Sequence, residues 1–379
     1  MAKKIIYLDN NATTSVDERV LDAMLPYFRD AYANAGSSHV SGLTAAEAVD
    51  DAAAEVAQLI GCHIKDIIFT SGATEGINLA MKGVDNNERK HIIVAATEHK
   101  AVLDTVGWLE QQGYTITRLK VSENGLIDLK ELRSVVTPNT LLVCIMMANN
   151  ETGVIQPIKE IAKIIHDHGA LFLCDATQAI GKIPVDVKDL KIDLMPFSAH
   201  KIYGPKGVGA LYISPSVRKN ISPQIHGGGH QGNLRSGTLN VPGIVGLGKA
   251  CEVAQRLMTE DTARIRHLRD MLDGELLKIE GTLVNGSIEN RLHTTTNICF
   301  PGIVSEKLIL ALQNIAVSNG AACSAVTAQP SHVLKAMGLS ETDALSSIRF
   351  SLGRFTTEED ISYTISRVTE IVDRFRQNI

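Results

Sequence analysis

Short apolar runs alternate with amphipathic helical patterns through the first half of the chain, and this alternation restricts the folds that the sequence can adopt. Runs typical of buried strands lie at residues 67–69, 92–95, 141–147 and 171–174. Helical patterns follow three of them and begin at Thr74, at about Lys100 and at Ile158. Such alternation predicts an α/β fold with a mostly parallel sheet between helices. Ligands bind at the carboxyl ends of the strands in such sheets, so functional residues are expected there.

The rest of the chain predicts a second, smaller domain. A long helical segment at 241–278 can carry the chain out of the first domain. After it come a strand-like run, a helical pattern, a loop of small residues and a terminal helix. We therefore expect a large domain at 15–255 and a smaller α+β domain made of 1–14 and 256–379. The length of 379 residues fits such a division better than one small core.

Two helices are expected before the first strand of the large domain. Residues 15–18 read Ser-Val-Asp-Glu, a capping-box pattern, and predict a helix that runs to about Tyr32. A second helical pattern covers residues 45–59.

Composition and charge exclude several classes of protein. The formal net charge of −5 gives no footprint for nucleic acids or anionic membranes. No apolar run approaches the ~18 residues of a membrane span, and the N-terminus lacks the apolar region of a signal peptide. The six cysteines form no C-x-x-C pair, so neither a zinc site nor a disulfide framework is predicted. We expect a cytoplasmic protein without a bound metal.

Lys201 ends the segment Ser198-Ala199-His200-Lys201, which directly follows the apolar run at 193–197. A lysine at the end of a buried strand can lose its proton, and its neutral amine can form a Schiff base with an aldehyde such as pyridoxal phosphate. Most lysines in a chain of this size are solvated surface charges, so Lys201 needs support from further residues.

Two other predicted strand ends offer partners to such a cofactor. Residues 71–75 form a glycine-containing turn before a helix, where backbone N–H groups and the Thr74 hydroxyl can bind a phosphate. A simple helix cap is the alternative. Asp175 can pair with a protonated pyridine nitrogen, and Gln178 can hydrogen-bond the ring oxygen. An aspartate that caps the next turn is the alternative here.

His99 and Asn150 complete the set at strand ends. The His99 imidazole can stack on a flat ring and transfer protons, or it can simply cap a helix. Asn150 can donate to the cofactor, although polar residues are expected in such a turn anyway. Alone, each of these residues is weak evidence. Together they place an anion cradle, an acid, an imidazole and a lysine at strand ends of one domain, which is what pyridoxal phosphate requires.

Eight segments resemble, in order, signature segments of the cysteine desulfurases. They lie at 7–14, 71–75, 97–99, 149–153, 175–178, 198–201, 227–230 and 235–238. The resemblance extends from residue 7 to residue 354, nearly the whole chain. It implies fold-type I architecture within the class-V aminotransferase superfamily, with a seven-stranded sheet, bound pyridoxal phosphate and a homodimer.

The resemblance also implies a role for each matching residue. Lys201 would hold the cofactor as a Schiff base and transfer a proton. Asp175 would contact the ring nitrogen, Gln178 the ring hydroxyl and His99 the ring face, with His99 also acting as acid and base toward the substrate thiol. The phosphate would be held by Ala73, Thr74, Ser198 and His200, with Thr238 contributed by the other subunit.

Three more residues would act on the substrate. Asn150 would contact both cofactor and substrate, and Arg349 would clamp the carboxylate of L-cysteine with its planar guanidinium. Cys323, among small residues at 318–325, would take the sulfur atom and carry it as a persulfide, since a thiolate is intrinsically nucleophilic. A small loop residue without any role is the alternative for Cys323.

The implied activity is that of a cysteine desulfurase, which converts L-cysteine to L-alanine and an enzyme persulfide. Residues 329–334 resemble the end of the long catalytic loop in the class that serves iron–sulfur cluster assembly, so an iron–sulfur scaffold is the expected acceptor protein. The chain ends at Ile379, without the extended tail by which the housekeeping enzyme docks its scaffold. Transfer RNA thiolation and DNA sulfur modification therefore stay open as pathways.

Other functions remain possible from the sequence. A selenocysteine lyase, an aminotransferase or a β-lyase on the same fold would turn over without Cys323. A persulfide relay or scaffold-binding subunit without turnover would lack Lys201 or Cys323, and both are present. Dinucleotide binding is not supported, because no G-x-G-x-x-G opens a helix after a strand.

Overall fold

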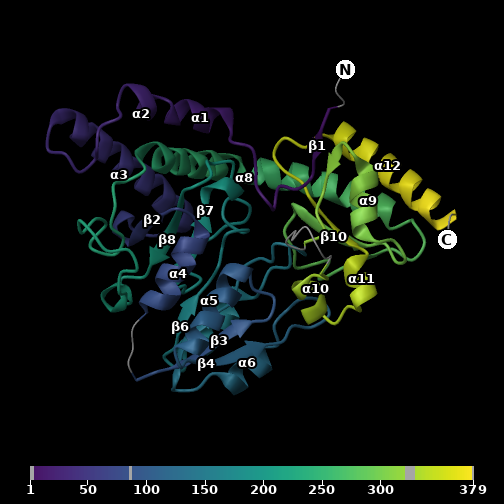
Figure 1. The fold of residues 1–379 in the computed structure, drawn as a ribbon, viewed down its shortest axis with the longest axis horizontal. Helices are drawn as coiled ribbons and strands as arrows, with labels where there is room; N and C mark the ends of the chain where they lie inside the picture. Colours follow the sequence, from purple (N-terminus) through teal and green to yellow (C-terminus); the bar gives the residue numbers. More distant parts are fainter. Residues whose placement is uncertain (1–3, 85–87, 321–328, 378–379) are drawn as a thin grey trace.

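A seven-stranded sheet lies at the centre of the larger part of the molecule in the computed structural model, which describes residues 4–84, 88–320 and 329–377 (Figure 1). The strand order is β2-β8-β7-β6-β5-β3-β4, and β8 is antiparallel to both of its neighbours whereas the other pairs are parallel. This confirms the mostly parallel α/β sheet. The strands are β2 (Ile67–Thr70), β3 (His91–Ala95), β4 (Thr115–Leu119), β5 (Thr140–Cys144), β6 (Leu171–Leu173), β7 (Leu194–Ser198) and β8 (Gly209–Ile213).

Helices cover both faces of this sheet because its strands are apolar on both sides. In β3, Ile93 faces a core formed with α3, α7 and α8, whereas Ile92 and Val94 face a second core formed with α4 and α5. The helices around the sheet are α3 (Val40–Ile60), α4 (Ala73–Gly83), α5 (Lys100–Gln111), α6 (Leu129–Val135), α7 (Ile158–His166) and α8 (Val241–Leu276), with short 3-10 turns η1 (Ile64–Asp66), η2 (Ala199–Lys201) and η3 (Arg218–Asn220).

A separate core lies around the second half of α8, and Figure 1 shows this helix passing between the two parts of the molecule. Two small sheets belong to this part: an antiparallel one in the order β12-β10-β9, and a parallel pair of β1 with β11. Its elements are β1 (Ile6–Tyr7), β9 (Leu283–Val284), β10 (Thr295–Cys299), α9 (Ser305–Leu312), β11 (Ile315–Ala316), α10 (His332–Ala336), α11 (Glu341–Leu345), β12 (Ser347–Ser351) and α12 (Glu358–Gln377).

The domain boundaries at 14/15 and 255/256 stay a proposal, which the separate cores support. Val241 and Leu247 at the start of α8 belong to the core of the large sheet, whereas Leu268 and Leu272 belong to the other core. Ile6 also belongs to the second core, although it lies at the other end of the chain.

The first helix differs from its prediction. Residues 15–32 form two short helices, α1 (Glu18–Met24) and α2 (Pro26–Arg29), instead of one. Pro26 lacks the N–H that a continuous helix would need, so α1 ends before it. The N-cap is Asp17, whose carboxylate accepts from the Arg19 N–H, and the capping box at Ser15 was therefore wrong.

No helix among the described residues combines the length and the apolar character that a membrane span needs.

Candidate active site

A cavity of about 790 Å³ lies where β2, β3, β5, β6 and β7 end, and the second part of the molecule closes it from the other side. Strand ends supply most of its polar lining, as expected for a parallel sheet. The structure brings together ten of the predicted site residues there: Ala73, Thr74, His99, Asn150, Asp175, Gln178, Ser198, His200, Lys201 and Arg349.

Lys201 lies on the short turn η2, directly after β7. Its Nζ donates to two backbone carbonyls of the N-terminal segment, 2.6 Å to Asn11 O and 2.7 Å to Ala12 O. Burial, together with the nearby Arg349 guanidinium, lowers the pKa of the Lys201 amine to about 8, against smaller opposing effects of Asp175 and Asp9. A sizeable neutral fraction at neutral pH follows, which a nucleophilic amine needs.

An anion cradle lies at the N-terminus of α4. Its N-cap is Gly72, which has no side chain of its own to cap the helix, and the Ala73 N–H donates to Ser198 Oγ at 2.7 Å. The backbone at Gly72 lies close to strand β8. Gly209 of β8 permits this, because a Cβ atom on Gly209 would lie 2.7 Å from the Gly72 Cα. Thr74 and the start of an eleven-residue helix therefore face the cavity with a positive dipole end.

His99 and Asp175 each make a local capping contact and also line the cavity. His99 caps α5, since its Nδ1 accepts from the Ala101 N–H at 3.1 Å, and it also lines the cavity. The proton of the neutral ring is therefore on Nε2. Burial lowers the pKa of His99, against the effect of Asp175. Asp175 Oδ1 accepts from the Thr177 N–H at 2.9 Å, and the residue is 5% exposed.

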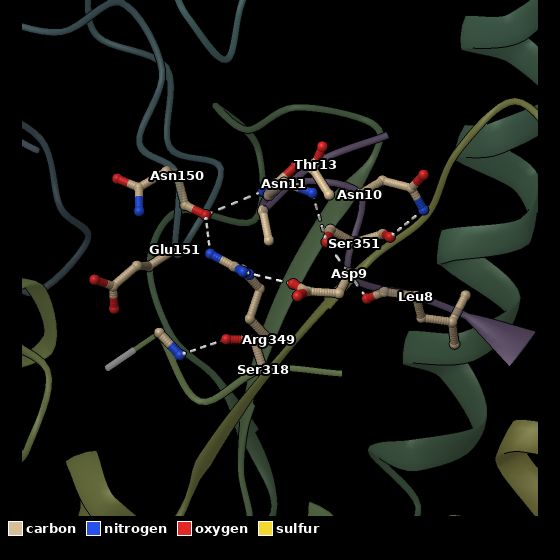
Figure 2. Close-up of polar contacts among 12 residues, drawn as sticks. Leu8, Asp9, Asn10, Asn11, Thr13, Asn150, Glu151, Ser318, Arg349 and Ser351 are labelled. Carbon is tan, nitrogen blue, oxygen red and sulfur yellow. Dashed lines mark hydrogen bonds and ion pairs between the residues drawn. The ribbon is translucent and has the colours of Figure 1, made fainter. Parts of the chain in front are cut away.

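Arg349 enters the cavity from β12, and Figure 2 shows its surroundings. One terminal nitrogen donates to Asp9 Oδ1 at 2.6 Å and the other to the backbone carbonyl of Asn150 at 2.9 Å. The Nε atom is buried and has no hydrogen-bond partner among the described residues. Backbone bonds in both directions tie Arg349 to Ser318. The guanidinium is thus held in place while donor capacity remains for a further ligand.

His200 and Glu151 line the cavity with shifted pKa values. Burial lowers the pKa of His200 to about 4, and its Nδ1 lies 3.1 Å from Thr13 Oγ1. Burial raises the pKa of Glu151 to about 7, against the effect of the Ser331 hydroxyl, which donates to its carboxylate at 2.5 Å. Glu151 is therefore an acid that can hold a proton near neutral pH.

Two predicted site residues are not placed in this cavity. Thr238 is not among the described residues that line the cavity in the single chain, so its contribution from another subunit stays a prediction. Cys323 lies at 321–328, outside the described residues, so its role stays a prediction.

Several cavity residues were missed by sequence reasoning. Asn11 and Ala12 act through backbone carbonyls, which no side-chain pattern reveals, although both lie in the segment 7–14 that carries the family resemblance. Glu151 lies in a quoted segment as well, but its burial gave no signal in the sequence.

Comparison with known proteins assigns the family. The Aminotransferase class-V family matches residues 6–364. Cysteine desulfurase IscS of Anaeromyxobacter dehalogenans is 48% identical over 377 residues, which cover 98% of this chain and 93% of that protein. The chain belongs to the cysteine desulfurase family. This confirms the resemblance found in the sequence, and it implies pyridoxal phosphate as a general trait of the family.

Solved structures agree with this cysteine desulfurase family assignment. A NifS-like protein superposes with a TM-score of 0.92 at 39% identity, over 97% of this chain and 99% of that one. SspA in complex with cysteine superposes with a TM-score of 0.81 at 36% identity, over 93% of this chain and all of that one (100%).

The cavity fits the cofactor that the family implies. Phosphate, ring nitrogen and aldehyde need an anion cradle, a carboxylate and an amine, which α4, Asp175 and Lys201 offer in one cavity. Two cavity residues also hold buried polar atoms without a partner among the described residues, Asn11 Oδ1 and Thr177 Oγ1. Buried polar atoms normally have partners, so a polar ligand is expected in this space.

Proposed function

We propose that this chain removes sulfur from L-cysteine, releases L-alanine and keeps the sulfur as a persulfide on Cys323. The observation that carries the proposal is the shared cavity, where Lys201, Asp175 and His99 from the large sheet lie with Arg349 from the smaller part. The relative solved with cysteine supports the choice of substrate. When bound, pyridoxal phosphate supplies an electron sink for the carbon atoms of the amino acid.

Residues around the cradle would hold this cofactor. The α4 N-terminus would bind the phosphate through backbone N–H groups, helped by side chains of Thr74, Ser198 and His200 and by Thr238 of a second copy. Lys201 would be its covalent attachment point. Asp175 would face the ring nitrogen, Gln178 the ring oxygen and His99 the ring face.

Arg349 would bind and orient the substrate. Its guanidinium is already fixed by Asp9 and by the Asn150 carbonyl, so little side-chain entropy is lost when a carboxylate binds. Asn150 itself lines the cavity and would contact both substrate and cofactor.

Lys201 and His99 would move protons. The Lys201 amine has a pKa near 8, so Nζ can both accept and release a proton near neutral pH. His99 would exchange a proton with the substrate sulfur at Nε2, because its Nδ1 is occupied by the Ala101 N–H.

Cys323 would take the sulfur. Its thiolate would attack the substrate sulfur atom, so that an S–S bond forms and the C–S bond breaks. The electron pair of the broken bond stays with carbon, which then takes up a proton to give L-alanine.

A Cys323→Ala variant tests the proposal. We expect unchanged visible absorption from the bound cofactor, while alanine formation from L-cysteine falls roughly 100-fold or more because the nucleophile is lost. Cys62→Ala is the matched control, since Cys62 is a partly buried thiol outside the cavity lining, and it should leave turnover unchanged.

Other outcomes would reject the proposal. Sulfide release at the unmodified rate from Cys323→Ala would contradict the persulfide role. Equal alanine formation from selenocysteine by both proteins would then favour a selenocysteine lyase. Absence of a visible band with Lys201 intact would favour a relay or scaffold-binding subunit.

We also propose a homodimer that passes its persulfide to an acceptor such as an iron–sulfur scaffold protein. Large apolar side chains are exposed on α1–α3 and could be covered by a second copy: Leu21, Leu25, Phe28, Val40 and Leu43. The relatives called IscS support the choice of acceptor. Light scattering should give twice the chain mass of 40.9 kDa, and a monomer would contradict the dimer. Transfer of labelled sulfur to a scaffold protein tests the acceptor.

A further inference from the structure

Lys182 lies beside the cavity, and none of the roles described above uses it. It follows Gln178 by four residues, and its Nζ donates to Gln178 Oε1 at 2.8 Å. Among the described residues, Lys182 forms no ion pair with a carboxylate. The side chain is only partly exposed. Within the described part of the chain, the side-chain partner of this partly buried cation is a neutral amide oxygen.

This contact decides which end of the Gln178 amide faces the cavity. An ammonium group only donates, so the amide oxygen must face Lys182 and the NH₂ group must face the other way. Accordingly, Gln178 Nε2 donates to Asn11 O at 2.9 Å, the same carbonyl that accepts from Lys201. The amide has a second N–H, and Gln178 lines the cavity. Gln178 can therefore offer a donor to a ligand oxygen.

The charges around Lys182 indicate that the ligand oxygen that accepts from the Gln178 amide is anionic. The charged and titratable groups that act on it or respond to it are Lys201, Arg349 and His293, all basic. Burial, together with Lys201 and Arg349, lowers the pKa of Lys182 to about 7. A buried cation normally has an anionic partner. A deprotonated ring oxygen of the cofactor is an anion that the Gln178 amide can reach from the cavity lining.

We propose that Lys182 is a positioning residue, which turns the Gln178 N–H toward the ring oxygen of pyridoxal phosphate and, through its charge, keeps that oxygen anionic. The inference rests on the proposed function, because it needs the same cofactor.

Lys182→Met removes both the donor and the charge. We expect the Kd of the apo-protein for pyridoxal phosphate to rise about tenfold, since a charge-assisted contact is lost. The midpoint of the pH titration of the visible band should also move to higher pH, because loss of a nearby cation favours the protonated form of the bound cofactor. Lys182→Arg should retain most of both properties, and Lys188→Met, at an exposed site on the same segment, should retain them fully.

A modified cofactor separates the specific role from a general one. In 3-O-methylpyridoxal phosphate the ring oxygen cannot ionise, so the wild-type protein and Lys182→Met should bind it with equal affinity. The thermal midpoint of the Lys182→Met apo-protein should be equal or higher, because an uncompensated buried cation has been removed.

Three results would overturn the inference: an unchanged titration midpoint and Kd in Lys182→Met, the same loss of affinity for the methylated cofactor, or a lowered thermal midpoint that accounts for the weaker binding. Failure of the wild-type protein to bind the cofactor at all would instead reject the proposed function, so the two failures are distinguishable.

Discussion

The two walls of the cavity hold their cations in different ways. On the wall formed by β12 and the N-terminal segment, Arg349 is ion-paired with Asp9. On the wall formed by the ends of the large sheet, Lys201 donates only to neutral carbonyl oxygens of the described residues, and Lys182, beside the cavity, donates to the neutral amide oxygen of Gln178. The paired cation is charged and oriented before any ligand arrives. The unpaired lysines have lowered pKa values and depend on a bound anion for compensation.

Arg349→Gln should produce the largest effect, because it removes the cation from the paired wall. We expect the KM for L-cysteine to rise roughly 100-fold, since a bidentate guanidinium–carboxylate contact is lost and Asp9 keeps an unpaired charge near the substrate. Steady-state kinetics with bound cofactor measure this. Arg118→Gln is the control, because it breaks an exposed ion pair with Glu110, and neither residue lines the cavity. A KM within twofold of the wild-type value would contradict the role of Arg349.

Asp9→Asn should produce an intermediate effect, because it removes the negative charge that pairs with Arg349 and leaves a side chain of nearly the same shape. The Asp9 charge raises the pKa of Lys201 and Arg349 lowers it, so loss of Asp9 should lower that pKa further. The neutral fraction of Lys201 at pH 7 then grows, and competitive acylation of the apo-protein should label Lys201 about two- to fivefold faster. Unchanged labelling would show that Asp9 does not act on Lys201, and labelling of the exposed Lys188 provides the internal reference.

Glu151→Gln should produce the smallest effect. It tests whether Glu151 stays protonated in the folded protein although the Arg349 guanidinium, which is paired with Asp9, lies nearby. Burial raises the pKa of Glu151 from 4.5 to about 7, although Arg349 lies close enough to oppose this. Between these values the folded chain keeps a proton that the unfolded chain loses, so this contribution to stability falls as pH rises through the window. Urea unfolding at pH 5 and pH 7 should show a decrease of about 1 kcal/mol per pH unit at most, and the variant should lose this part of the slope. An equal slope in both proteins would mean that Glu151 is ionised in the folded state.

Sequence reasoning located the sheet because five of its strands, or parts of them, are apolar runs followed by polar turn residues. It did not find β11, since a two-residue strand has no periodicity to detect. Asp175 and His99 were assigned to the site although each also caps a local turn, and the structure shows that capping and lining the cavity are compatible. The capping role holds the side chain in place, so the two interpretations were not true alternatives.

The hardest features to predict depend on contacts between distant parts of the chain. Lys182 follows Gln178 by four residues, a spacing that is visible in the sequence. The lack of a carboxylate partner among the described residues is visible only in the structure. The pairing of Arg349 with Asp9 joins residues at opposite ends of the chain. Such pairs are fixed only by the tertiary fold.

The pairing of β1 with β11 also sets the order in which the site can be completed during synthesis. Ile6 leaves the ribosome first, but its partner Ile315 follows only after most of the chain has been made, tens of seconds later at ordinary elongation rates. Until then, the carbonyls of Asn11 and Ala12 have no fixed position from which to hold the Lys201 amine. Nascent chains that already contain the whole large sheet should therefore lack a finished pocket, and capture of the cofactor becomes a step that follows translation.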